Sequence, residues 1–309
     1  MTAVAQRVRR PQATRSTRAH GRRRSLNPLA LPALLFFGVF GLVPMIGCLL
    51  LSFTTWDGLG AIHLSGLTSW RAVLRNSELP HALWVTFLIL IISWAFQTPL
   101  SILLGVFLAA QKRYRGVLSV FYFIPVLLSS AAIAITYKAL LDPNFGLGAG
   151  LHWPLLTQDW LGQPKLALGC VIFIVSWQFI PFHTLLYQGA VRQIPVSMYE
   201  AATLDGAGRV RQFFSITLPQ LRYTIITSST LMVAGSLTFF DLIFVLTNGG
   251  PADATRGLAL DMYREGFQAN LMGQASAIAV ILVVIGLLLA LGLRRLGGRD
   301  ATASQLEGA

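Results

Sequence analysis

Residue types that could carry out covalent chemistry are few in this chain, and they lie far apart. None of the three lysines, Lys112, Lys138 and Lys165, belongs to a GxxxxGK[ST] phosphate loop, so the sequence predicts no ATP-hydrolysing site on this chain. No HExxH or GxSxG sequence occurs, and the five histidines are scattered. Cys48 and Cys170 lie within apolar runs, where neither a disulfide framework nor a thiolate metal site is expected. These observations argue against a membrane-embedded enzyme.

The most informative spacing lies in residues 193–221, which read QIPVSMYEAATLDGAGRVRQFFSITLPQL. Ser197 and Glu200 have the spacing of a capping box, in which the serine oxygen accepts from the N3 amide and the glutamate returns to the N-cap amide. Asp205-Gly206 predicts the end of the helix, because glycine readily adopts the left-handed conformation that closes a helix. We expect a helix that starts near Ser197 and is too short to be stable alone in water, so it must pack against a partner.

Polar and aromatic residues within the apolar runs are candidates for a solute pathway. Gln97 and Gln178 lie near the middle of their runs, and the neighbouring Trp94 and Trp177 could offer apolar ring faces to a sugar. In the alternative interpretation, the amides hydrogen-bond between helices and the tryptophans pack against the core or lipid. Asp241 is the only acidic residue well inside an apolar run, and we expect it near the outer mouth as a gate or receptor-docking residue, or as a solvated carboxylate.

Six apolar runs must position these residues. Each has about the 20 residues needed to cross the hydrocarbon core of a membrane. They are continuously apolar rather than alternating, which favours helices over barrel strands. The chain is 54% hydrophobic and only 12% charged, whereas a soluble domain has about 25% charged residues. We therefore predict an all-α polytopic membrane protein with six transmembrane helices, at residues 29–53, 82–110, 117–141, 166–188, 223–246 and 274–293.

The distribution of charge predicts the topology. The net charge is +12, but the basic residues lie between the apolar runs rather than along one soluble face, which argues against nucleic-acid binding. Most of the 24 lysines and arginines fall on the inside if the arginine-rich N-terminus is cytoplasmic, as the positive-inside rule requires. We predict a disordered basic cytoplasmic tail at 1–28 that lies against membrane lipid, a transmembrane domain at 29–296, and a cytoplasmic C-terminal tail at 297–309.

One pattern also resembles a known family. Glu200-Ala201-Ala202, three residues, Gly206, nine residues, Ile216, one residue and Leu218-Pro219 are similar to the EAA signature of permease subunits in binding-protein-dependent ABC importers. Residues 123–147, 240–251 and 262–267 resemble the first permease of the maltose-transporter-like carbohydrate branch. The resemblance covers about residues 29–296 and implies the ABC importer type I permease fold.

The resemblance also implies partners and residue roles. Two partner ATP-binding subunits would hold ATP and Mg²⁺, and this chain would hold no cofactor. A second permease would complete a heterodimer, and an extracytoplasmic solute-binding protein would deliver the solute. In an alternative with a smaller role for this segment, Glu200 only caps its own helix and Gly206 only ends it. The residues implied in coupling to the ATPase are Glu200, Ala201, Ala202, Asp205, Gly206 and Pro219.

The function that the resemblance implies is sugar import. The chain would be a multi-pass permease of a bacterial inner membrane that moves a di- or oligosaccharide into the cytoplasm by alternating access. The alternative is an ion-coupled secondary transporter of a small polar solute. That alternative normally requires ionisable groups at mid-membrane, which are scarce in this sequence.

Overall fold

The computed structural model describes the backbone of residues 27–109 and 113–296. Residues 1–26 of the predicted basic tail and all of the predicted C-terminal tail lie outside this description. The chain divides into two units, residues 1–46 and 47–309. The described part of the first unit is apolar and helical, with α1 (Asn27–Phe37), the π-helical turn η1 (Gly38–Leu42) and the beginning of α2 (Val43–Leu51), which continues into the second unit.

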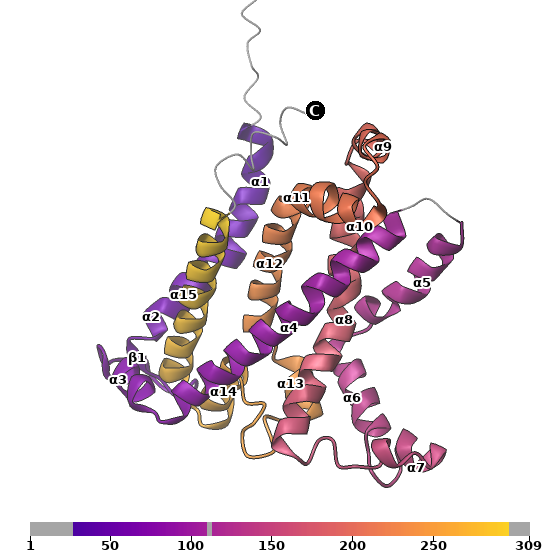
Figure 1. Ribbon diagram of the computed structural model, residues 1–309. Helices are drawn as coiled ribbons and strands as arrows, with labels where there is room; N and C mark the ends of the chain where they lie inside the picture. Colours follow the sequence, from indigo (N-terminus) through magenta and orange to yellow (C-terminus); the bar gives the residue numbers. More distant parts are fainter. Residues whose placement is uncertain (1–26, 110–112, 297–309) are drawn as a thin grey trace, which may run out of the picture. The chain divides into compact units, whose positions relative to one another are not determined.

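The second unit is almost entirely helical (Figure 1). Its only sheet among the described residues is one antiparallel pair, in which Thr54 lies opposite Leu64. In chain order its elements are β1 (Thr54–Thr55), β2 (His63–Leu64), α3 (Thr68–Arg75), α4 (Glu78–Ala109), α5 (Arg113–Leu127), α6 (Ser130–Leu140), α7 (Leu147–Leu151), η2 (Pro154–Leu156), α8 (Pro164–Arg192), α9 (Val196–Leu204), α10 (Arg209–Gln212), η3 (Phe213–Thr217), α11 (Leu218–Gln220), α12 (Arg222–Leu237), α13 (Asp241–Leu246), α14 (Leu258–Tyr263), η4 (Arg264–Gln268) and α15 (Met272–Leu296).

Four helices in the described residues are long and apolar enough to cross a membrane. They are Ala30–Leu51, Glu78–Ala109, Pro164–Arg192 and Met272–Leu296. A fifth span results if the bent pair Gly116–Leu127 and Ser130–Leu140 counts as one. The all-α polytopic prediction is confirmed, and four of the six predicted runs are single helices.

The third and fifth predicted runs are wrong as unbroken helices. The third bends by 95° between α5 and α6, because Ser129 adopts an extended conformation and its hydroxyl accepts the Ala132 N–H to start a new helix. The fifth ends at Leu237, where the Thr238 hydroxyl donates to the Gly235 carbonyl, and the chain resumes as α13. Hydropathy averaged over a window of residues does not predict these two breaks, because the residues around each break are still apolar.

The packing of α4 against α8 forms the centre of the second unit. The largest cluster of buried apolar side chains joins α4, α6, α8 and α13 through residues such as Ile89, Ile133, Ile174 and Ile243. In a membrane, apolar side chains move from lipid into the protein interior rather than out of water, so the hydrophobic effect does not drive their association. Close van der Waals packing has to stabilise such an interface instead. Gly105 permits it, because a Cβ there would lie only 2.8 Å from the Tyr187 Cβ.

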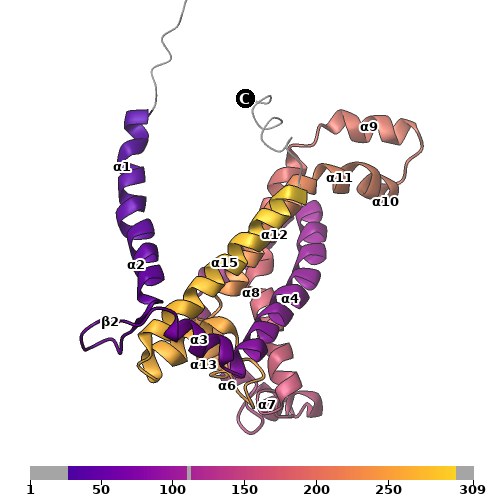
Figure 2. The same cartoon turned by 90° about the vertical axis from the view of Figure 1, so that its left-hand side faces the viewer.

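The two ends of this helical bundle carry different structures. In both views α9, α10 and α11 lie together at one end of α4 and α8, whereas α3, α7 and α13 lie toward the other (Figures 1 and 2). The EAA-like segment is therefore separated from the α3 and α7 loops by the length of the long helices.

Candidate coupling segment and solute cavity

The EAA-like segment forms a short helix with a defined beginning. Helix α9 begins at Val196 with Pro195 as its N-cap, and the cap residue makes no side-chain hydrogen bond. The prediction of a helix start near Ser197 is confirmed, but the capping box is wrong, because Ser197 lies inside the helix. Pro195, with φ −58° and ψ 130°, makes the entry turn itself, as the fixed φ of proline favours.

The end of α9 follows the prediction. Asp205 is the C-cap, and Gly206 has φ +73°, in the left-handed region. The Gly206 amide donates to the Thr203 carbonyl at 3.0 Å, and the Ala207 amide donates to the Ala202 carbonyl at 2.8 Å. These two bonds form a Schellman motif, so glycine is required here by backbone conformation.

Helix α9 does not bury an apolar face against the rest of the described structure. None of its residues is buried, and Leu204 is 90% exposed. Polar contacts hold the helix to the following segment. The Tyr199 and Thr217 hydroxyls lie 2.9 Å apart, and the Gln212 amide donates to the Thr203 hydroxyl at 3.0 Å. A free helix of this length is marginal in water, so the exposed face of α9 is suited to a partner.

Pro219 lies within α11, where the EAA-like segment turns into α12. Helix α12 begins three residues later, at Arg222. The EAA-like residues of α9 therefore connect through η3 and α11 to a helix that lines the cavity described next.

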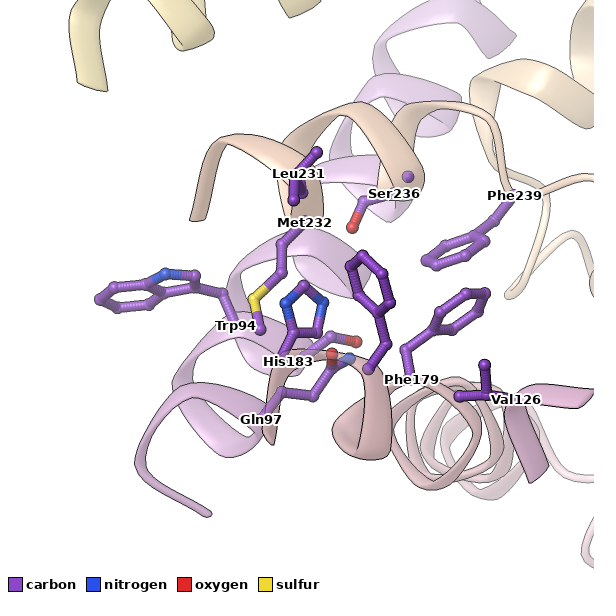
Figure 3. A pocket seen from close by; sticks show the side chains of 12 residues that line it. Trp94, Gln97, Val126, Phe179, His183, Leu231, Met232, Ser236 and Phe239 are labelled. Carbon is purple, nitrogen blue, oxygen red and sulfur yellow. The ribbon is translucent and has the colours of Figure 1, made fainter. Parts of the chain in front are cut away.

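A cavity of about 220 Å³ lies among α4, α8 and α12 (Figure 3). Two of the predicted pathway residues, Trp94 and Gln97, line it. The rings of Phe179 and Phe239 pack at its edge with centroids 5.4 Å apart. The full lining consists of Ser93, Trp94, Gln97, Val126, Phe179, Phe182, His183, Leu231, Met232, Gly235, Ser236 and Phe239.

The polar groups of the cavity differ in whether they have partners. The Trp94 indole donates to the Ser229 hydroxyl at 2.8 Å, and the Gln97 amide donates to the Ser176 hydroxyl at 3.4 Å. Both bonds join different helices. The buried Ser93 hydroxyl has no hydrogen-bond partner among the described residues. Ser93 itself is only 2% exposed, so this hydroxyl is an unsatisfied polar group within the wall rather than one that faces the open cavity.

Trp177, Gln178 and Asp241 do not line this cavity. The Gln178 amide donates to the Ser130 hydroxyl at 3.2 Å, which holds the bend between α5 and α6. Trp177 makes an edge contact with Tyr137 at a centroid distance of 5.6 Å. Asp241 is the exposed first residue of α13 rather than a residue inside a continuous span, because the fifth predicted run is broken before it.

His183 was not among the predicted pathway residues, yet it lies in the cavity wall. Its Nδ1 is 2.9 Å from the Ser228 hydroxyl, and the contact joins α8 to α12. A sequence signal existed, because Phe179, Phe182 and His183 are spaced three and four residues apart and so share one face of a helix.

An ionic cluster at the end of the bundle that carries α3 was also missed. The buried Arg256 pairs with Asp261 and Glu78. Burial lowers the pKa of Arg256, but the charges of Asp261, Glu78 and Asp253 and the hydrogen bond to Asp261 outweigh burial and raise it overall. The cluster ties the loop before α14 to the start of α4. Asp253, Arg256 and Asp261 are close in sequence, but Glu78 is distant from them, so no local motif predicts the complete cluster.

Further polar contacts fix the loop that precedes α14. The Leu258 amide donates to the Thr86 hydroxyl of α4 at 2.9 Å. Arg264 donates to the Asp253 carboxylate at 2.9 Å and to the Asn248 carbonyl at 2.6 Å. The loop 247–257 is therefore fixed at its end to α4, through Leu258, and along its length to η4, through Arg264.

Comparisons with known proteins agree on one class. The model of the family "Binding-protein-dependent transport system inner membrane component" matches residues 97–299. The chain is 31% identical over 270 residues to the probable ABC transporter permease protein PH1215 of Pyrococcus horikoshii, covering 84% of this chain and 91% of that one. It is 29% identical over 262 residues to the multiple sugar-binding transport system permease protein MsmF of Streptococcus mutans, covering 84% and 88%.

A solved structure shows the same fold. A chain in the crystal structure of a bacterial ABC transporter involved in the import of the acidic polysaccharide alginate is similar with a TM-score of 0.75 and 24% identity, over 88% of this chain and 94% of that one.

The fold is that of a membrane subunit of a binding-protein-dependent ABC transporter. The chain belongs to the family of inner membrane components of binding-protein-dependent transport systems. The resemblance predicted from the EAA-like spacing is confirmed. The chain is a multi-pass inner membrane permease, and ATP hydrolysis resides on another subunit.

Proposed function

We propose that this permease moves a sugar, a di- or oligosaccharide, into the cytoplasm of a bacterium by alternating access. The observation that carries the proposal is the cavity among α4, α8 and α12, whose lining combines aromatic side chains such as Trp94 and Phe179 with polar side chains such as Gln97. Sugars are bound by such combinations of ring faces and hydrogen-bonding groups. Neither a lysine, an arginine nor a carboxylate lines the cavity, which favours a neutral sugar over a phosphorylated one.

The size of the cavity limits what it holds at one time. Its volume of about 220 Å³ is below the roughly 300–1,000 Å³ of typical ligand pockets. We infer a transient subsite for a single sugar ring rather than a site for a whole oligosaccharide. The names of relatives support a sugar, since they include the trehalose/maltose transport system permease protein MalF of Thermococcus litoralis, 31% identical over 225 residues that cover 71% of this chain and 75% of that one.

The topology that we propose has six spans and cytoplasmic termini. It counts α5 with α6, and α12 with α13, as broken spans. The charge of the two ends supports it. At the end with α9 the basic side chains outnumber the acidic ones, with Arg192, Arg209, Arg211 and Arg222 against Glu200 and Asp205, whereas at the other end Arg256 and Arg264 are outnumbered by Glu78, Asp253, Asp261 and Glu265. Basic residues favour the cytoplasmic side.

The proposed mechanism starts at α9. The face that includes Glu200, Ala201, Ala202, Asp205 and Gly206 would dock on one of two ATP-binding subunits, which bind ATP and Mg²⁺. Closure of those subunits would move α9, and the Tyr199–Thr217 contact would transmit the movement through η3 and Pro219 to α12. Because α12 lines the cavity, its reorientation would change access to the solute.

The remaining partners and residues complete the proposal. A second permease would form a heterodimer with this chain, and a solute-binding protein would dock outside. Asp241 lies exposed at the start of α13, which suits a role at the outer mouth. For Trp177 and Gln178 we propose packing and interhelical hydrogen bonding, since their contacts are with Tyr137 and Ser130.

Uptake by the reconstituted transporter tests the proposal. Proteoliposomes would contain this chain, its second permease, the ATP-binding subunits and the solute-binding protein, and labelled oligosaccharides would be offered outside. We expect ATP-dependent uptake that Gly206→Asp abolishes without preventing membrane insertion, because a side chain at φ +73° distorts the end of α9. Gly208→Asp is the matched control, because Gly208 has an ordinary φ of −69° and open space around it.

The ion-coupled alternative gives a different result in the same vesicles. Uptake driven by an ion gradient without ATP, and unaffected by Gly206→Asp, would contradict the importer mechanism.

A further inference from the structure

A second cavity lies at the end of the bundle that carries α9. It has a volume of about 600 Å³, and residues of α4, α8, α9, α10 and η3 form its walls. It does not share a lining residue with the cavity beside Trp94. The proposed sugar pathway therefore leaves this larger space unexplained.

Two arginines give the cavity an unneutralised positive charge. Arg192, at the end of α8, and Arg209, at the start of α10, both line it. Neither forms an ion pair with a carboxylate in the described part of the chain, where all four ion pairs involve Arg256 or Arg264. The Arg192 Nε donates only a long hydrogen bond, 3.4 Å, to the Ala109 carbonyl. Two guanidinium groups that face one space are suited to phosphate oxygens.

The rest of the wall combines apolar and hydroxyl groups. Val106 and Val191 contribute from the ends of the spans α4 and α8, and Phe213 contributes from η3. Tyr199 and Thr217 add hydroxyl groups. A free phosphate ion gains nothing from the apolar part of this wall, whereas a lipid chain does.

We propose that this cavity binds the phosphodiester of an anionic phospholipid from the cytoplasmic leaflet. Arg192 and Arg209 contact the phosphate oxygens, and the first part of an acyl chain lies against Val106 and Phe213. The proposal rests on the orientation given under the proposed function, because the cytoplasmic leaflet carries the anionic lipids that basic pockets between spans recognise.

The same lipid would support α9 without blocking the ATP-binding subunit. Val196 and Tyr199 line the cavity, and because residues three apart share a helix face, they define the side of α9 toward the lipid. Ala201 and Asp205 of the proposed docking set do not line the cavity, and at about 100° per residue they lie on the opposite side of the helix from Tyr199. The lipid therefore fixes the position of the coupling helix from the membrane side.

Lipid retention by the whole transporter tests the proposal. The assembled complex would be purified in detergent and titrated with phosphatidylglycerol or, for comparison, with phosphatidylcholine. Native mass spectrometry would measure how much of each lipid is bound. We expect R192Q/R209Q to weaken phosphatidylglycerol binding about tenfold or more, since each basic residue near a membrane surface contributes about a fivefold effect. R209Q and R211Q form a matched pair, because both remove one charge from α10 and only Arg209 lines the cavity.

The outcomes separate the possible occupants. Stronger loss of lipid in R209Q than in R211Q supports the proposal. Equal loss in both variants would show a diffuse surface charge and overturn it. Competition by inorganic phosphate or glycerol phosphate as effective as competition by the lipid would assign the site to a free anion. Loss of the ATP-binding subunit from R209Q with unchanged lipid would assign the cavity to that subunit. The assay uses neither sugar nor ATP turnover, so its failure leaves the sugar-import proposal untouched.

Discussion

At the scale of single residues, the buried carboxylate of Asp261 needs the positive charge of Arg256 to stay stable in the folded protein. Asp261 is only 1% exposed and is paired with the Arg256 guanidinium. Arg256→Gln removes the cation and leaves a buried carboxylate, which costs about 3–5 kcal/mol. We expect a large fall in the apparent melting temperature of the purified complex in nanodiscs. Arg264→Gln is the control, because its partner Asp253 has a side chain that is 43% exposed, and equal shifts for both variants would refute the argument.

Glu265 makes the stability of the folded protein depend on pH. Burial raises its pKa above the ordinary value of 4.5, and the negative charge of Asp261 adds to the effect. The folded state therefore binds a proton at higher pH than the unfolded state does, and the stability contributed by this group falls as pH rises through the raised pKa. We expect Glu265→Gln to match the wild type below about pH 4.5 and to be more stable at neutral pH. Melting curves against pH that run parallel for both proteins would contradict this.

The candidate pathway shows what sequence can and cannot place at this scale. Gln97 and Gln178 both lie near the middle of apolar runs, and the number of residues from the end of a run predicts that depth well. Counting does not give the face of the helix that a side chain occupies. Gln178 points to the bend at Ser130, whereas Phe179, one residue further and about 100° around the helix, lines the cavity.

At the scale of helices, the contact of α4 with α8 depends on one small residue. A Cβ on Gly105 would lie 2.8 Å from the Tyr187 Cβ and 3.1 Å from the Gln188 backbone nitrogen, neither of which can rotate away. We expect Gly105→Ala to push the two helices apart, with a cost of about 1–3 kcal/mol. Because both helices line the solute cavity, sugar uptake should fall together with the apparent melting temperature.

Gly169→Ala is the control for this substitution. Gly169 lies inside α8, and no atom outside its own helical turn lies within 4 Å of the place that a Cβ would take. Alanine there only improves helix propensity, by up to about 1 kcal/mol. Destabilisation by Gly169→Ala as large as that by Gly105→Ala would show that close approach is not the cause.

The helices also show where sequence patterns succeed and fail. The long runs of α4, α8 and α15 are predicted because hydropathy persists over their full length. The end of α9 is predicted because only a residue such as Gly206 tolerates its φ of +73°. The breaks at Ser129 and Thr238 are missed, since a hydroxyl that caps or bonds back to a helix barely changes the average hydropathy.

At the scale of the whole molecule, the family and the exposed helix are predictable from sequence, but the connection between coupling segment and cavity is not. The EAA-like spacing is local, and it lies within residues 97–299, which the family model matches. The cavity requires α4, α8 and α12 to meet, and the ionic cluster requires Glu78 to meet Arg256. Contacts between residues so far apart in sequence depend on tertiary packing. Composition and local spacing do not predict that packing.

In the proposed mechanism, movement of α9 reaches α12 through polar contacts with the segment between them. Because α9 has no buried residue, the proposed mechanism assigns that role to its hydrogen bonds with the following segment, and Tyr199 supplies one of them at 2.9 Å from Thr217. Tyr199→Phe removes that hydroxyl and keeps the ring. We expect the reconstituted transporter to retain ATP hydrolysis but to import several-fold less sugar per ATP, since one hydrogen bond contributes about 0.5–1.5 kcal/mol. Tyr223→Phe is the control, because the Tyr223 hydroxyl forms no hydrogen bond with a described residue; equal coupling ratios in the two variants would place transmission elsewhere.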